Sequence, residues 1–431
     1  MNIIDLIEKK VAKQELSKEE IYFVVNGFVS GKIKDYQMAS FLMATRIQDF
    51  TDQETFYLTE AFIDSGATVN LDHINKIKLD KHSTGGVGDK ISMIILPILS
   101  ALDIVIPKIS GRGLQHTGGT VDKLESVNNL NCEIDENTFK KQVEETGIAI
   151  IAQSSKIVPA DQKIYALRDV TATVSSVPLI AASIMSKKLV TGADYILIDV
   201  KCGNGAFMQT LEQAQLLSEK LVAIGNHFGK KTFAQITNMS SPLGKMVGNK
   251  NEVLEAISIH QGKGPKLLTE FAFDLVALVL KMTKGIEKEE ALKMIAEVIE
   301  TRKSLNKFYQ LLEAQGGDIS PIKSDSFWNP KYKYEHKAEK DGFIKWKSAM
   351  NFGKISVFLG AGRLTKEDKI DSEAGIELKF ENSESVKAGE TIFVLYSSNP
   401  IDVNKFNDLI KDAYSIEESA FEHKMFLDLI S

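Results

Sequence analysis

Cysteine is almost absent from this sequence. The 431 residues include only Cys132 and Cys202, and no CxxC pair occurs. Because a disulfide scaffold needs several spaced cysteines, we predict a reduced, intracellular protein. The first residues alternate apolar and charged side chains at helical spacing and lack the continuous apolar core of a signal peptide. The same start therefore predicts a cytoplasmic location.

Long apolar runs are also missing. The most apolar segment, residues 91–106, is interrupted by Pro97 and Asp103 and is too short to cross a bilayer comfortably. We therefore expect no membrane partner and predict a buried helix that leads into a strand. With 43% hydrophobic residues, the chain has enough apolar material for a large core and more than one domain.

Positive charge is outnumbered by negative charge. The sequence has 52 basic and 58 acidic residues, giving a net charge of -6. Nucleic acids and anionic membranes are usually bound by basic surfaces, so we expect neither as a main partner. Five of the basic residues are arginines: Arg46, Arg112, Arg168, Arg302 and Arg363. Since only arginine offers a planar fork of five donors, these positions are candidates for places where lysine would fail.

Two common catalytic motifs are not met. The stretches GFVSGK at residues 27–32 and GKMVGNK at residues 244–250 both lack the GxxxxGK spacing of a phosphate-binding P-loop. No HExxH or His-Cys cluster indicates zinc. An NTPase and a zinc enzyme are therefore not supported.

The order of helical and strand-like patterns predicts an α/β protein made of three parts. Helical patterns occupy residues 1–67 and return at 161–192, which predicts a small all-helical domain in two pieces. Strands and helices alternate over 68–160 and 193–330, which predicts a large α/β domain with a mostly parallel sheet. Residues 331–431 read as a C-terminal α+β unit, and the gap between helical and α/β domains is the expected ligand site.

Two glycine-rich turns each follow a predicted strand. The first is KHSTGGVGDKIS, residues 81–92, and the second is KISGRGLQHTGGTVDKLES, residues 108–126. Glycines let backbone N–H groups approach an anion, and hydroxyls from two neighbouring turns could enclose a tetrahedral oxyanion between them. The alternatives remain open: the first stretch could be an ordinary tight turn, and the hydroxyls could simply cap helices.

A third group combines Arg168 with Ser183 and Lys187. The last two are four residues apart, so on a helix they share one face and could contact the same small, electron-rich planar molecule. In the alternative interpretation, Lys187 and Lys188 are a solvated helix end and Arg168 pairs with Asp169.

These motifs resemble those of the thymidine and pyrimidine-nucleoside phosphorylases. SGRGLQHTGGTVDKLES is similar to the signature of that family, and KHSTGGVGD, YALRDVTATV, SIMSKK and the stretch from Asn238 follow in its order and spacing. The resemblance covers nearly the whole chain. It implies a homodimer, formed through the helical domain, that converts a pyrimidine nucleoside and phosphate into free base and pentose 1-phosphate.

The resemblance also assigns roles to residues. The phosphate ligands would be Lys81, Ser83, Ser92, Lys108, Ser110 and Thr120. The base would be held by Tyr165, Arg168, Ser183 and Lys187, and His82, Arg168 and Lys187 would act in catalysis. Bond cleavage places negative charge on the departing base, which donors of this kind stabilise; an imidazole near neutrality could act in either protonation state.

No organic cofactor or catalytic metal is expected, because phosphate is the co-substrate. The resemblance implies a monovalent cation near Gly88, Leu243 and Glu255, yet Lys90 stands where related enzymes carry a threonine. Its ammonium could fill the place of the cation. In having a lysine at position 108, the sequence is similar to those members of the family that accept both uridine and thymidine. Two other functions stay open: a transferase like anthranilate phosphoribosyltransferase, and a non-catalytic nucleoside-binding protein of the same fold.

Overall fold

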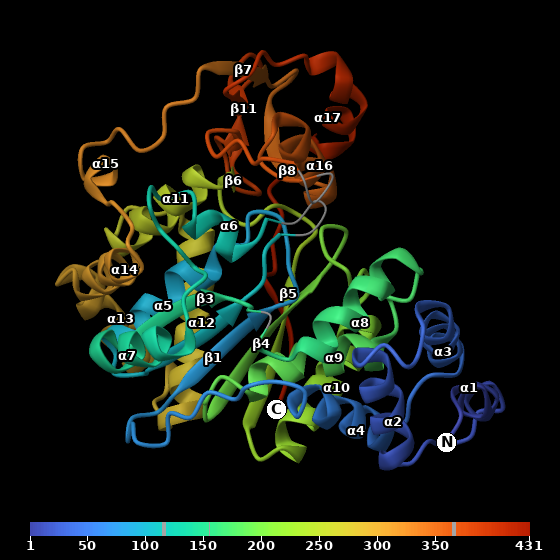
Figure 1. Ribbon diagram of the computed structural model, residues 1–431. Helices are drawn as coiled ribbons and strands as arrows, with labels where there is room; N and C mark the ends of the chain where they lie inside the picture. The colour runs from blue at the N-terminus through green and yellow to red at the C-terminus, as the bar shows by residue number, and fades with distance from the viewer. Residues whose placement is uncertain (114–117, 155, 364–367) are drawn as a thin grey trace.

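The computed structural model describes residues 1–113, 118–154, 156–363 and 368–431. Six helices form the helical domain: α1 Ile3–Val11, α2 Lys18–Val29, α3 Asp35–Gln48, α4 Asp52–Ile63, α8 Pro159–Val170 and α9 Val177–Leu189. The first four and the last two come from distant parts of the chain and pack together at one side of the molecule (Figure 1). Helices from two separate stretches of the chain therefore form one helical bundle.

Local sequence signals fix where these helices begin. Capping boxes start α2, through Ser17 and Glu20, and α4, through Thr51 and Glu54. In each, the hydroxyl accepts a backbone N–H of the first turn and the glutamate accepts the N–H of the capping residue. Glu54 also pairs with the buried Lys10 at 2.9 Å, which ties α4 to α1.

The large domain is built on parallel strands. Its elements are β1 Leu79–Ser83, α5 Ile91–Ala101, β2 Ile106–Ser110, α6 Thr120–Leu124, α7 Glu136–Thr146, β3 Ile148–Ala152, β4 Tyr195–Cys202, α10 Leu211–His227, β5 Lys231–Asn238, β6 Met246–Gly248, α11 Lys250–His260, α12 Lys266–Lys284, α13 Lys288–Glu300, α14 Lys303–Ala314 and α15 Ser320–Lys323. Strands β1, β4 and β5 are parallel neighbours, as are β2 and β3. A parallel bridge from Lys78 to Val105 places β2 beside β1. The apolar segment forms the buried α5 and then β2, as predicted.

The C-terminal unit contains β7 Tyr332–Lys337, β8 Gly342–Trp346, α16 Ala349–Leu359, β9 Gly375–Leu378, β10 Ser385–Val386, β11 Thr391–Ser397, the 3-10 helix Val403–Phe406, α17 Asn407–Ala413 and β12 Tyr414–Glu417. Strand β6 of the large domain joins its sheet beside β9. In exchange the last strand, β13 Phe426–Ile430, runs back and pairs antiparallel with β5 (Figure 1). The expected mostly parallel sheet thus ends in one antiparallel edge strand, whose residues were expected to belong to the C-terminal unit.

The two faces of the central sheet are covered by different helices. Leu79, Leu197 and Phe233 face the core that includes α5 and α12. Their neighbours Ile196, Ile198 and Ala234 face α9 and α10. Since side chains alternate along a strand, each strand sends successive residues into opposite environments. Both cysteines are buried free thiols, and no helix within the described ranges has the length and apolar character to cross a membrane.

Candidate active site

Alternation divides the end of β1 between two chemical environments. Asp80 lies on the α9 side, where the ammonium of Lys188 is 2.8 Å from its carboxylate. Lys81 lies on the opposite side, 3.2 Å from Asp199 of β4. His82 and Ser83 continue the alternation. One strand end therefore presents an imidazole toward the helical domain and a lysine and hydroxyl toward the glycine turns.

The first glycine turn is organised around Ser83 and Asp89. The Ser83 hydroxyl donates to the carboxylate of Asp89 and accepts the N–H of Gly85 at 3.2 Å. Gly88 has a φ of 72°, and a Cβ placed there would lie 2.6 Å from the carbonyl oxygen of Leu243. This position therefore requires glycine for both conformation and space.

Two lysines hold the second glycine turn against the first. Lys108 of β2 donates to the carbonyl of Lys81, and Lys123 of α6 donates to the carbonyl of Asp89 at 2.9 Å. Lys123 also pairs with Glu252 at 2.6 Å. Residues 114–117 of the second turn lie outside the described residues. The expectation that the two turns lie side by side is met at the described residues that flank this gap.

The predicted phosphate ligands lie around these turns. Lys81, Ser92 and Lys108 are buried, whereas Ser110 and Thr120 are partly exposed. The Lys81 ammonium has no hydrogen-bond partner among the described residues. Lys108 is surrounded by protein and faces the charge of Lys188, so the pKa of Lys108 falls well below its usual value. A buried ammonium without a hydrogen-bond acceptor is costly unless an anion joins it.

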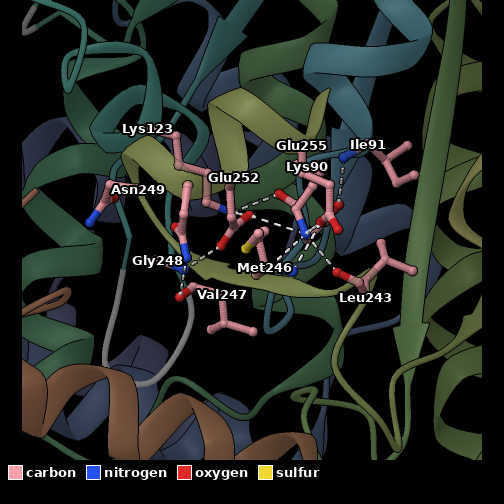
Figure 2. A network of polar contacts seen from close by, with 12 residues as sticks. Lys90, Ile91, Lys123, Leu243, Met246, Val247, Gly248, Asn249, Glu252 and Glu255 are labelled. Atoms are coloured by element: carbon pink, nitrogen blue, oxygen red, sulfur yellow. Dashed lines mark hydrogen bonds and ion pairs between the residues drawn. The ribbon is translucent and has the colours of Figure 1, made fainter. Parts of the chain in front are cut away.

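Lys90 lies in a cage of oxygen atoms. Its ammonium is 2.7 Å from the carbonyls of Leu243 and Met246 and 2.6 Å from the carboxylate of Glu255 (Figure 2). Glu255 also accepts the backbone N–H of Lys245 at 2.7 Å. These contacts fasten the first glycine turn to the segment that enters α11. Figure 2 shows the neighbouring Lys123–Glu252 pair beside them.

The Arg168 guanidinium forms its hydrogen bonds with backbone carbonyls. Its three nitrogens donate to the carbonyls of Thr173, Val174 and Leu179 at 3.3, 2.8 and 3.0 Å. Burial lowers the pKa of Arg168 to about 10, so it remains protonated at neutral pH. A guanidinium has five N–H groups, so two remain for another acceptor. The fork thus orders the turn between α8 and α9, a use that the sequence did not indicate.

Lys187 is held by residues on both helices. Its ammonium donates to the carboxylate of Asp161, to the carbonyl of Ser183 at 2.6 Å and to the Ser183 hydroxyl at 2.9 Å. Ser183 and Lys187 therefore share a helix face, as their spacing predicted. Tyr165 lies with its ring 5.6 Å from the Arg168 guanidinium. The alternative pairing of Arg168 with Asp169 is not the arrangement observed.

Lys188 differs from the alternative interpretation of the sequence, which placed it at a solvated helix end. Its side chain is 3% exposed and reaches Asp80 and the carbonyl of Ile109 at 2.6 Å. It is not a solvated helix end. Burial and the charges of Lys188 and Lys108 place the pKa of His82 well below its usual value. This direction favours the neutral imidazole in the protein without bound substrates.

Several acidic residues of the site were not found from sequence. Asp161 contacts Lys187, Asp199 contacts Lys81, Asp89 accepts the Ser83 hydroxyl, and Asp80 receives Lys188. For Asp199 the available signal was an aspartate inside a largely apolar strand, because a buried carboxylate needs a partner. Metal binding has no obvious donor set, since no group of three or more His, Cys, Asp or Glu within the described part is placed to hold an ion.

A helical bundle joined to a parallel α/β domain, with hydroxyls and lysines at the strand ends opposite a basic helix, defines a glycosyl transferase fold. Matching family models describe a glycosyl transferase helical bundle domain at residues 4–66 and a glycosyl transferase a/b domain at 75–305. A third, the pyrimidine nucleoside phosphorylase C-terminal domain, matches residues 343–417.

Curated relatives point in the same direction. A pyrimidine-nucleoside phosphorylase of Staphylococcus epidermidis is 48% identical over 92% of this chain and 92% of its own length. The Staphylococcus aureus enzyme of that name is 44% identical over 99% of this chain and 100% of its own. The chain belongs to the pyrimidine-nucleoside phosphorylase family.

Solved structures with low identity share the fold. Anthranilate phosphoribosyltransferase of Thermus thermophilus superposes with a TM-score of 0.58 at 15% identity, covering 72% of this chain and 99% of its own. The Saccharomyces cerevisiae enzyme gives 0.55 at 13% identity, covering 73% and 98%. This likeness concerns the fold alone.

Proposed function

We propose that this chain catalyses the reversible phosphorolysis of pyrimidine nucleosides, giving free base and (deoxy)ribose 1-phosphate. Thymidine, deoxyuridine and uridine are the proposed substrates. One observation carries the proposal: the Lys81 ammonium is buried near Asp89 of the first glycine turn, 3.2 Å from Asp199, and has no hydrogen-bond partner in the described residues. A tetrahedral dianion would supply the missing acceptors there.

Phosphate would bind through Lys81, Ser83, Ser92, Ser110 and Thr120, with Lys108 alongside. Support comes from the lysines that lock the two turns together, since fixed donors cost little reorganisation when the reaction occurs. When phosphate binds, the Ser83 hydroxyl would rotate away from Asp89 and donate its hydrogen bond to the ligand instead.

The base would lie against the helical domain, held by Tyr165, Arg168, Ser183 and Lys187. A phosphate oxygen attacks C1′ from the face opposite the base, the C1′–N1 bond breaks, and its electron pair leaves with the pyrimidine. The cationic Arg168 and Lys187 stabilise that negative charge, and neutral His82 donates a hydrogen bond to a base oxygen. No enzyme nucleophile is needed, because positioning of the two substrates supplies most of the effect.

The deciding experiment tests whether base release depends on inorganic phosphate. Purified protein is incubated with thymidine, deoxyuridine or uridine, with and without inorganic phosphate, and the released base is measured. We expect release that depends on phosphate. The rival transferase would instead join anthranilate to phosphoribosyl pyrophosphate, and a non-catalytic binder would bind thymine with no turnover. Either outcome, in the absence of phosphate-dependent release, rejects the proposal.

Lys90 would also make the enzyme independent of a monovalent cation. Its ammonium already contacts two carbonyls and one carboxylate, the ligands that such an ion would use. We expect equal activity in potassium, sodium and choline chloride. A Lys90→Thr variant tests the reason, because removing the ammonium should lower activity and make it respond to potassium. Strong activation of the unaltered protein by potassium would contradict this account.

A homodimer through the helical domain is the proposed assembly, in the cytoplasm. Large apolar side chains are exposed on its helices, with Ile4 56%, Tyr36 73% and Ile47 71% exposed. Exposed apolar residues that gather on one domain are typical of an interface. Light scattering should give twice the chain mass, and Tyr36→Glu with Ile47→Lys should shift it toward the monomer. A monomeric unaltered protein would contradict the proposal.

A further inference from the structure

Asp199 of β4 lies between two buried ammonium groups. Its Oδ2 atom is 2.8 Å from Nζ of Lys201 and 3.2 Å from Nζ of Lys81. Its Oδ1 atom accepts the hydroxyl of Thr237 on β5 at 2.7 Å. All three charged side chains are completely buried. One carboxylate therefore serves two lysines.

The sheet register places these groups on one face. Ser83 of β1 is opposite Asp199 of β4, and Lys201 is two residues further along β4. Side chains two residues apart point to the same side of a sheet, so Lys201 faces the side that carries Lys81 and Ser83. The backbone is coupled as well, because the N–H of Lys201 donates to the Thr84 hydroxyl at 2.8 Å.

The Asp199 carboxylate is shared by two ammonium groups. Neither ammonium has a hydrogen-bond partner within the described ranges, although the carboxylate of Asp89 also lies within the reach of their charge. The ring of Phe271 lies 5.1 Å from the Lys201 ammonium and offers only its π-face. A buried ammonium without a hydrogen-bond acceptor is unfavourable, so a bound anion would supply acceptors that the protein does not.

Asp89 of the first glycine turn responds to the same charges. Burial alone would raise its pKa, but the positive charges of Lys201, Lys81 and Lys123 hold that pKa well below its usual value. The field of Lys201 thus extends to the turn that carries Ser83. The pair Lys10–Glu54 in the helical domain offers a contrast, because one ammonium there meets one carboxylate.

We propose that Lys201 is a positioning residue for the phosphate co-substrate. Lys201 contacts the same carboxylate oxygen of Asp199 as Lys81 does and offsets part of its negative charge. Asp199 can therefore orient Lys81 without neutralising the positive charge that Lys81 offers to phosphate. The inference rests on the proposed phosphorolysis and adds a residue outside both glycine turns. If Lys201 were lost, Asp199 and Lys81 would form a neutral pair and phosphate would bind to a site with one charge fewer.

The test separates phosphate binding from nucleoside binding. In Lys201→Met we expect the KM for phosphate to rise about tenfold or more, the effect of one buried charge, while the KM for thymidine changes by no more than about twofold. Phosphate should also raise the melting temperature of the unaltered protein more than that of the variant. Lys10→Met serves as the matched control, because it removes a buried lysine far from the turns and should leave both KM values unchanged.

The possible outcomes are distinct. If Lys201→Met does not fold, Lys201→Gln keeps a polar side chain of similar length and is measured in its place. An unchanged phosphate KM in a folded variant, or an equal rise of both KM values, overturns the role of Lys201 while leaving phosphorolysis intact. Absence of phosphate-dependent base release from the unaltered protein rejects the proposed function, and the inference falls with it.

Discussion

Lys188 and Asp80 form a buried ion pair of 2.8 Å that joins helix α9 to strand β1. The same ammonium donates to the carbonyl of Ile109 at the end of β2. One side chain from the helical domain thus contacts both strands from which the glycine turns emerge. This contact places the helix that carries the proposed base residues beside the strands that carry the proposed phosphate residues.

Removing Lys188 should destabilise the protein strongly. Lys188→Met leaves Asp80 buried without its partner, a change that typically costs about 3–5 kcal/mol of unfolding free energy. Urea denaturation followed by circular dichroism measures it. Lys293→Met is the control, since its pair with Glu289 is exposed and should contribute less than about 1 kcal/mol. Similar losses in the two variants would contradict the structural role of Lys188.

Replacing Arg168 by lysine should lower activity although the charge is kept. A lysine cannot hold the carbonyls of Thr173, Val174 and Leu179 in the arrangement that the fork imposes. We expect Arg168→Lys to reduce kcat by about a hundredfold, comparable to the loss of one aligned donor. Steady-state kinetics with thymidine measures this, and full activity would show that the fork is dispensable.

His82 should remain neutral where an ordinary histidine is half protonated. Burial and the neighbouring lysines oppose a further positive charge, which lowers the pKa of His82. In an NMR titration of isotope-labelled histidine, assigned with His82→Gln, its signal should show the neutral form at pH 6.5. Lys188→Met removes one opposing charge and should raise this pKa. A His82 signal that titrates near 6.5 in the unaltered protein would contradict the assignment.

Acid should destabilise the core through His260. Burial lowers the pKa of His260 to about 4, and its Nε2 lies 3.0 Å from the carbonyl of Met93. An unfolded histidine has a pKa of about 6.5 and so binds more protons between these values. The free energy of unfolding should therefore fall as pH decreases from about 6.5 to about 4, by up to about 1.4 kcal/mol per pH unit.

The variant His260→Gln isolates this contribution. Glutamine can still donate to the Met93 carbonyl but does not titrate, so the slope of stability against pH should become smaller by the share of one proton. Denaturation curves at several pH values give both slopes. Equal slopes for variant and unaltered protein would show that His260 does not cause the acid sensitivity.

Local sequence patterns predict much of the fold. The capping residues of α2 and α4, the buried α5 and the alternation of strands and helices are properties of neighbouring residues, so the sequence predicts them. The exchange of β6 and β13 between units depends on edge pairing between distant segments. No local pattern of residues 426–430 indicates which sheet they join.

The site shows the same division. Glycine turns and the spacing of Ser183 and Lys187 were visible because each lies within one segment. The roles of Asp199 and Asp161 could not be predicted from sequence, because their basic partners come from other elements. Those contacts depend on strand register and helix packing. Lys188 was misjudged for the same reason, since its exposure is set by β1 and β2 rather than by its own helix.

In the proposed reaction phosphate itself attacks the nucleoside. This step is tested by following thymidine and phosphate with the purified protein by 1H and 31P NMR. We expect one deoxyribose 1-phosphate for each thymine released, formed as the α anomer because attack occurs opposite the base. Formation of the β anomer, or release of thymine without phosphate, would contradict it.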